Sequence, residues 1–100
     1  MADHDFNMDN HWLPFTPNRS FKKDPRVFVG ADGMHFTTHD GRQVIDGISS
    51  LWCVAAGHNR KPINEAIKKQ LDTLDYATAF QASNDRAFEA SEMIAAMAPG

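Results

Sequence analysis

Two side chains in this chain could form a nucleophile and its base. They are the single cysteine, Cys53, and His58, five positions further on. A cysteine nucleophile needs a nearby base and a lowered pKa. The intervening residues cross a predicted turn, which separates the two side chains. Because Cys53 stands in an apolar run, we interpret it as a small buried hydrophobic residue.

A metal site is the second chemistry that the residue types suggest. His35 and His39 are four apart, a spacing that chelates a metal on a helix. Their segment predicts a strand, however, in which four residues span roughly 13 Å. No cysteine or carboxylate cluster adjoins them, so the sequence predicts no metal site. The glycines form neither a dinucleotide-binding nor a Walker pattern and are interpreted as turn residues.

The longest apolar stretch runs from Leu51 to Gly57 and contains Trp52. Turn residues flank it on both sides, Asp46-Gly47 before it and His58 to Arg60 after it. Such a bounded apolar run predicts a buried segment. Trp52 could fill a core or form the wall of a pocket, and its neighbours alone leave both possibilities open.

Three short strands are predicted before this loop, and they must position it. Residues rich in β-branched and aromatic side chains predict strands over 26–29, 34–39 and 42–46. Gly30 to Gly33 predicts the first turn. Asp40-Gly41 predicts a two-residue type I′ hairpin turn, which needs positive φ at both positions. We expect a small antiparallel meander, which is marginally stable by itself.

Two helices are predicted after the loop. The first begins near Pro62, which suits the first turn of a helix. The second begins at the capping candidates Ser83, Asn84 and Asp85 and ends at Pro99-Gly100. Apolar residues at helical spacing predict buried faces on both helices. These residues are Ile63, Ala66, Ile67, Leu71 and Leu74 on the first helix, and Ala87, Phe88, Ser91, Ile94, Ala95 and Ala98 on the second.

The amino-terminal region shows little regular patterning. Residues 1–10 are polar and predict a flexible tail. From His11 to Phe21, aromatic residues alternate with Pro14 and Pro17, which disfavour a regular helix. We expect this segment to pack as an irregular arm over another surface.

The composition excludes several classes of function. The net charge is −3 and the pI is near 5.9, and the scattered basic residues form no face for nucleic acid or an anionic membrane. The apolar stretch is too short to span a bilayer, and the acidic start does not resemble a signal peptide. One cysteine fits a reducing compartment, so we expect a cytoplasmic protein.

Three segments carry a resemblance to a known family. Asp46 to Arg60 resembles the pattern DG-x-SGLWCV-x-x-GH-x-R, His11 to Thr16 resembles H-W-x-P-F/Y-T, and Gln70 to Tyr76 resembles Q-L-x-T-L-D-Y. These patterns are typical of the class III omega-aminotransferases, which depend on pyridoxal 5'-phosphate (PLP). The resemblance covers roughly residues 11 to 100.

The resemblance implies an α/β protein of PLP-dependent transferase fold type I. This chain would supply its N-terminal arm, small antiparallel meander and first helices. Residues 1–10 would form the flexible tail, 11–82 the arm, meander and helix of the small domain, and 83–100 the first helix leading into the large PLP-binding domain. The apolar last helix, which finds no partner in the predicted elements, favours an N-terminal part of a longer enzyme.

The resemblance also implies site residues for substrate. The positions of Leu51 and Trp52 line the substrate pocket in the family, Phe15 borders its entrance, and Phe80 reaches toward the neighbouring subunit's site. None of the five lysines matches the one that bonds PLP. The cofactor contacts and the catalytic residues would therefore lie beyond residue 100, and the segment alone would not be catalytic.

The implied reaction moves an amino group from an omega-amino acid or primary amine, through PLP, to an alpha-keto acid such as pyruvate. A homodimer or homotetramer is implied. Within the class, a diamine, taurine or diaminopelargonate aminotransferase is the alternative. A free-standing 100-residue interaction module that uses exposed aromatic residues is the alternative from another class.

Overall fold

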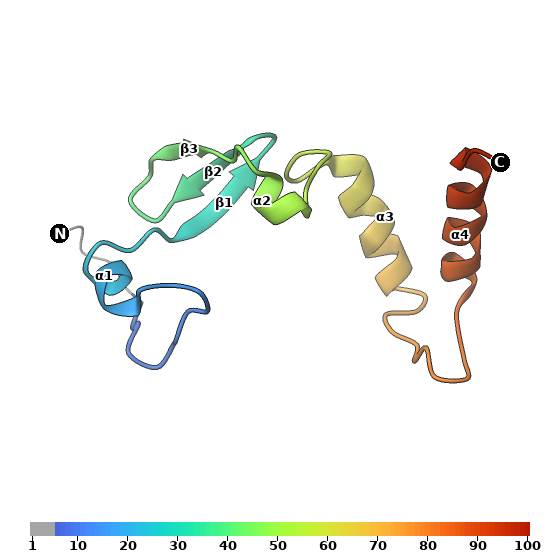
Figure 1. Ribbon diagram of the computed structural model, residues 1–100, viewed down its shortest axis with the longest axis horizontal. Coiled ribbons are helices and arrows are strands. Elements are labelled where there is room, and N and C mark those ends of the chain that lie inside the picture. Colours follow the sequence, from blue (N-terminus) through green and yellow to red (C-terminus); the bar gives the residue numbers. More distant parts are fainter. Residues whose placement is uncertain (1–5) are drawn as a thin grey trace. The chain divides into compact units, whose positions relative to one another are not determined.

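A computed structural model describes residues 6–100 of the chain, which divides into two units. The first unit, Met1–Ile63, contains the sheet, and the second, Asn64–Gly100, is helical (Figure 1). The predicted domain boundary between residues 82 and 83 stays a prediction.

The first unit is built on an antiparallel sheet of three strands. The strands are β1 (Phe28–Asp32), β2 (His35–Thr38) and β3 (Gln43–Ile45), in the order β1-β2-β3. Phe36 pairs with Ala31 on one side and with Val44 on the other. The rings of Phe28 and Phe36 stack with centroids 4.0 Å apart. The predicted meander is confirmed (Figure 1).

The predicted first strand and first turn are wrong in position. Ala31 and Asp32 pair with Phe36 and His35, so residues 30–32 belong to β1 rather than to a turn. A register irregularity between Phe28 and Gly30 accommodates this extension of the ladder. The turn itself is confined to the two residues between Asp32 and His35, where Gly33 has φ +58°.

The second hairpin forms at the predicted place but with a different turn. Gly41 has φ +84°, while Asp40 is not left-handed, so the predicted type I′ turn is wrong. The backbone N–H of Thr38 donates to the Arg42 carbonyl at 2.9 Å, which encloses a three-residue loop. Thr38 is buried, and its hydroxyl bonds to Asp40 and accepts from the N–H of Arg42 at 3.0 Å. These side-chain contacts select the longer loop.

A short helix, α1 (Asn18–Lys23), corrects the prediction of an irregular arm through Phe21. Pro17 directly precedes the first helical residue, where its missing N–H costs nothing. Its carbonyl accepts from the N–H of Phe21 at 3.0 Å. Residues 1–5 of the predicted tail lie outside the described residues. Phe6 is anchored, with its ring edge against His39 at a centroid distance of 5.5 Å.

Two longer helices follow the loop and agree with the predicted helical spacing. Helix α3 (Lys61–Leu71) contains Pro62 in its first turn and ends three residues before Leu74. Helix α4 (Asp85–Met97) is capped by Asn84, whose side chain accepts from the N–H of Ala87 at 3.0 Å. In the described part of the chain, no helix has the length and hydropathy of a bilayer-spanning segment.

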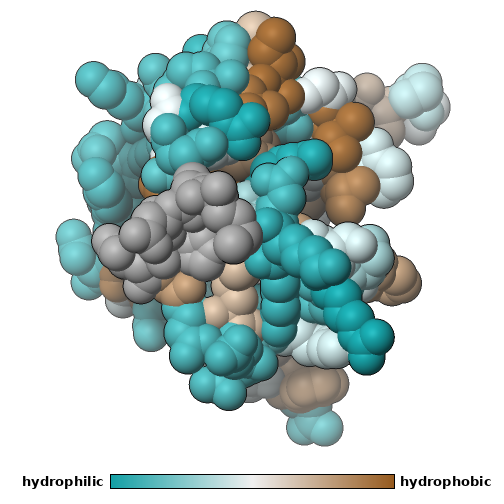
Figure 2. All heavy atoms as spheres, turned by 90° about the vertical axis from the view of Figure 1, so that its left-hand side faces the viewer, coloured by the Kyte–Doolittle hydropathy of each residue, from teal (hydrophilic) through white to brown (hydrophobic). Residues whose placement is uncertain are grey.

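Burial is the main departure from the predictions. Among residues 6–100 no hydrophobic residue is buried, and no helix packs against another element. Apolar side chains therefore lie open on the surface (Figure 2). The apolar stripes of α3 and α4 and the run from Leu51 to Gly57 were predicted to be buried, and for the described residues this is wrong. The spacing identifies the faces, but nothing in these residues covers them.

We expect residues 1–100 in isolation not to unfold as one cooperative unit. Hydrophobic burial is the dominant favourable term in folding, and the described residues form no apolar core. A thermal melt followed by circular dichroism, with an amide NMR spectrum, checks this. The expected result is a broad, non-cooperative change and poor dispersion. A sharp two-state transition with dispersed signals would contradict it.

Candidate functional site

The loop between β3 and α3 contains a short turn, α2 (Ser49–Trp52), with unusual backbone. Its four residues have φ of 50°, 49°, 60° and 69°, so all lie in the left-handed region. That conformation costs L-residues about 1 to 2 kcal/mol each. The N–H of Trp52 donates to the Ile48 carbonyl at 3.1 Å, and that of Val54 to the Ser49 carbonyl at 3.1 Å. Further contacts must offset the strain.

Asp46 supplies those contacts. Its carboxylate accepts from the N–H of Ser50 at 3.0 Å, from the Ser50 hydroxyl at 2.9 Å and from the N–H of Ile48 at 3.4 Å. It also bonds to Nε2 of His58 at 2.7 Å. The Asp46 side chain is only 4% exposed. One nearly buried carboxylate therefore binds both the start of the loop, at Ile48 and Ser50, and its end, at His58.

These bonds set the charge state of Asp46. They lower the pKa of Asp46 from 3.8 to about 2, with the N–H of Ser50 as the largest cause and the His58 bond as a smaller one. Asp46 is thus ionised at neutral pH, and Nε2 of His58 must carry the proton that it donates. Because the pKa falls on folding, the carboxylate favours the folded loop above about pH 4, and this contribution is lost as pH falls through about 2.

His58 links the loop to the sheet. Its backbone exchanges two hydrogen bonds with Gly33, at 3.1 and 2.7 Å, as an isolated antiparallel bridge. Its ring lies 4.4 Å from that of Phe36, centroid to centroid. The N–H of Asp46 donates to the Met34 carbonyl at 2.8 Å. The Asp46–His58 pair is therefore fixed to the β1–β2 hairpin by backbone as well as side-chain contacts.

The arrangement is not a catalytic triad. In a triad the histidine takes the proton of a serine hydroxyl. Here the Ser50 hydroxyl donates to Asp46, the same carboxylate that binds His58. Cys53 is exposed, and its thiol donates to the Leu51 carbonyl at 3.4 Å, not to His58. The prediction that Cys53 is buried is therefore wrong for the described residues, since nothing there covers the loop.

The predicted substrate residues Leu51 and Trp52 lie together in the left-handed turn. Leu51 is 64% exposed and lines a groove of about 880 Å³ between α1, the sheet and the loop. Phe21, Phe28 and Ile48 form apolar parts of the same groove. Trp52 is 85% exposed and does not line it. The turn therefore presents one apolar side chain to the groove and one to solvent.

The third predicted residue, Phe15, also lies in a left-handed conformation, with φ 49°, and is fully exposed. The buried side chain of Asn18 holds its turn. Asn18 accepts from the N–H of Leu13 at 2.8 Å and donates to the carbonyls of Leu13 and Thr16, both at 2.9 Å. The side chain of Asn18 thus fixes the turn that carries the exposed Phe15, as the side chain of Asp46 fixes the turn that carries the exposed Trp52.

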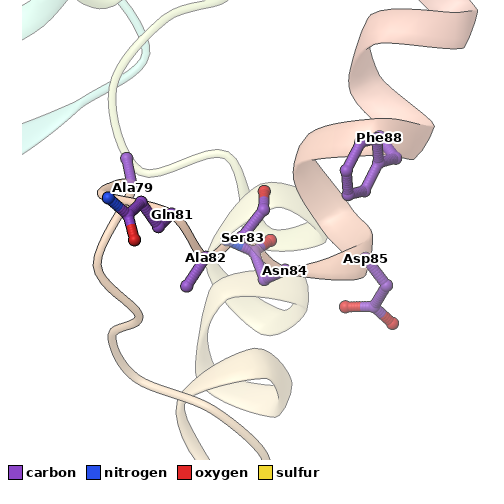
Figure 3. A pocket seen from close by; sticks show the side chains of 7 residues that line it. All are labelled: Ala79, Gln81, Ala82, Ser83, Asn84, Asp85 and Phe88. Carbon is purple, nitrogen blue, oxygen red and sulfur yellow. The ribbon is translucent and has the colours of Figure 1, made fainter.

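The fourth predicted residue, Phe80, belongs to the second unit and is 89% exposed. The segment around it borders a shallow hollow next to the start of α4 (Figure 3). Seven side chains line that hollow, namely Ala79, Gln81, Ala82, Ser83, Asn84, Asp85 and Phe88. Phe80 is not one of them.

The side chains that could hold a metal or bond a cofactor are histidines, cysteine, carboxylates and lysines. No group of three histidine, cysteine or acidic side chains is placed to hold a metal among residues 6–100. A cleft beside the Asp46–His58 pair is lined by Asp32 to His35, Ser49, Val54 to Gly57 and Arg60. None of the five lysines lines this cleft, the groove or the hollow. Lys68 is paired with Glu65 at 2.8 Å on the exposed face of α3. The residues present do not fit PLP.

Sequence reasoning did not identify the Asp46–His58 pair or the role of Asn18. Asp46 was interpreted as the end of the third strand and as part of the turn with Gly47, and His58 was considered only as a turn residue and as a base for Cys53. A local signal existed, because aspartate accepts from N–H groups two to four residues on. The His58 partner is twelve residues away and has no such local signal.

The sequence of the chain matches one protein family and is similar to curated members of it. Residues 18–100 match the protein family described as aminotransferase class-III. The beta-alanine–pyruvate aminotransferase of Pseudomonas aeruginosa is 47% identical over 96 residues, which make up 96% of this chain and 21% of that protein. The omega-amino acid–pyruvate aminotransferase of Pseudomonas putida is 46% identical over 93 residues, 93% of this chain and 21% of that protein. The chain therefore spans about a fifth of the length of the curated relatives it matches.

A solved structure agrees with the fold. An amine transaminase from an uncultivated Pseudomonas species, determined in a PLP-bound form, matches with a TM-score of 0.75 and 33% identity. The match covers 88% of this chain and 20% of that one. The fold of the matched residues is thus similar to the corresponding part of a much longer protein.

Proposed function

Since the chain belongs to the class III aminotransferase family and to PLP-dependent fold type I, we propose that it forms the N-terminal part of a longer transaminase. The enzyme would move an amino group from an omega-amino acid or primary amine to an alpha-keto acid such as pyruvate. The family match over residues 18–100 is the observation that carries this proposal. The names of the two relatives favour these substrates over a diamine, taurine or diaminopelargonate.

The part played by this chain is to bind the carbon skeleton of the substrate. Leu51 and Trp52 would form one wall, with Phe15 at the entrance. An apolar wall with an aromatic ring suits a substrate with an apolar body and one amine, because it does not compete for the amine. The left-handed turn presents Leu51 to the groove between α1, the sheet and the loop, and this placement supports the role. Phe80 would extend toward the site of a neighbouring subunit in a homodimer or homotetramer.

The cofactor belongs to the rest of the enzyme in this proposal. PLP supplies an electron sink for the amine carbon. The lysine, carboxylate and phosphate contacts that hold it would come from outside residues 1–100, because no lysine here lies in a pocket described above. We further propose a cytoplasmic location, which the single cysteine supports.

An amino-transfer assay on the longer protein that contains this chain tests the proposal. The protein, loaded with PLP, is incubated with β-alanine or a primary amine and with pyruvate. The expected result is alanine formed in step with loss of the amine. An interaction module would give no alanine with any amine at any pyruvate concentration, and that outcome would overturn the proposal.

A further inference from the structure

The left-handed turn Ser49–Trp52 has little to hold it except polar contacts. Its two large side chains, Leu51 and Trp52, are exposed and gain little from burial in the described residues. Four consecutive L-residues at positive φ are strained, and such strain persists only where surrounding contacts impose it. The contacts that fix this turn are therefore the ones that decide where Leu51 and Trp52 point.

Those contacts converge on one carboxylate. Asp46 binds the N–H and hydroxyl of Ser50, inside the turn, and the ring of His58, beyond it. The His58 backbone is in turn bonded to Gly33 of the β1–β2 hairpin. A contact chain thus runs from the sheet through His58 and Asp46 to the backbone of the turn. We call these three residues, Asp46, Ser50 and His58, the loop lock.

We propose that Asp46 and His58 are positioning residues that hold Leu51 and Trp52 in one orientation and so set which amines the enzyme accepts. This inference rests on the proposed function, because it assigns selectivity to the same apolar wall. Neither side chain needs to touch substrate. A preformed wall discriminates by shape, whereas a loop that samples several conformations loses that discrimination.

Hydrogen exchange on the longer, PLP-loaded protein tests the lock itself. Asp46→Ala should speed amide exchange in the peptide that spans residues 47–58 by about tenfold or more, the effect of losing bonds to a charged group. Asp40→Ala is the matched control. Asp40 is also a carboxylate in a loop, but its side-chain bonds go to Thr38 and Arg42 and not to the turn. It should leave exchange over residues 47–58 unchanged.

Selectivity is measured on the same variants. The ratio of kcat/KM for a small and a bulky amine should shift by roughly threefold to tenfold in Asp46→Ala and stay constant in Asp40→Ala. A merely structural role for Asp46 would lower the thermal midpoint without moving the ratio.

The two measurements distinguish failure of the loop lock, of the positioning role and of the proposed function. If exchange over residues 47–58 is unchanged in Asp46→Ala, the lock is refuted whatever the activity. If exchange rises but the ratio stays constant, the positioning role is refuted. If Asp46→Ala does not fold, the isosteric Asp46→Asn should show smaller shifts in the same direction, and no shift would count against the lock. If the unaltered protein transfers no amino group, the proposed function fails and selectivity with it, while the exchange measurement still decides the lock.

Discussion

Replacing Trp52 with alanine is expected to change which amines the enzyme accepts far more than it changes stability. Trp52 is 85% exposed among the described residues and lies on a strained turn, and the proposed function assigns its ring to the wall of the substrate pocket. Losing an apolar wall forfeits about 1 to 3 kcal/mol for substrates that fill the pocket, or roughly tenfold to 100-fold in kcat/KM. Bulky amines that the ring excludes should gain relative to small ones.

Two measurements on the longer protein check this prediction, the thermal midpoint and kcat/KM for one small and one bulky amine. Trp12→Ala is the matched control, because Trp12 is the other tryptophan of the chain and is also exposed. It should leave the ratio of the two constants unchanged. Truncating a core tryptophan costs about 3 to 5 kcal/mol. A collapsed midpoint with a constant ratio would show that Trp52 is core, and the pocket assignment would be wrong.

Local signals in the sequence predicted most of the secondary structure. Asn84 was one of three capping candidates, with Ser83 and Asp85, and it is the residue that caps α4. The helical spacing predicted α3 and α4, and segments rich in β-branched and aromatic residues predicted the meander. Each of these depends on residues a few positions apart, which a sequence displays directly.

Features that depend on contacts between side chains were not predicted. The hydroxyl of Thr38 selects a three-residue loop where Asp40-Gly41 indicated a two-residue turn. The bond between Asp46 and His58 joins residues twelve apart, and four consecutive residues between them are left-handed. Burial was mispredicted for a different reason. An apolar stripe identifies the face that needs covering, but the covering surface is absent from the described residues.

The second large effect concerns the cofactor. We expect PLP to bond covalently to the longer protein at a lysine outside residues 1–100 and at none of the lysines within them. Transaminase chemistry requires a lysine that bonds the cofactor. Such a lysine acts from a desolvated pocket. Lys23, Lys61, Lys68 and Lys69 are exposed, and Lys22 lies at the end of α1 and lines none of the pockets described.

The measurement that tests the account most directly is borohydride reduction of the PLP-loaded longer protein, followed by peptide mapping in a mass spectrometer. The reduced cofactor should be found on one lysine outside residues 1–100, with Lys22, Lys23, Lys61, Lys68 and Lys69 unmodified. A parallel sample of residues 1–100 should carry no specific adduct. A stoichiometric adduct on any of these five lysines would contradict the proposal that the lysine bonding PLP lies outside residues 1–100. The absence of any adduct on the longer protein would contradict the PLP-dependent function itself.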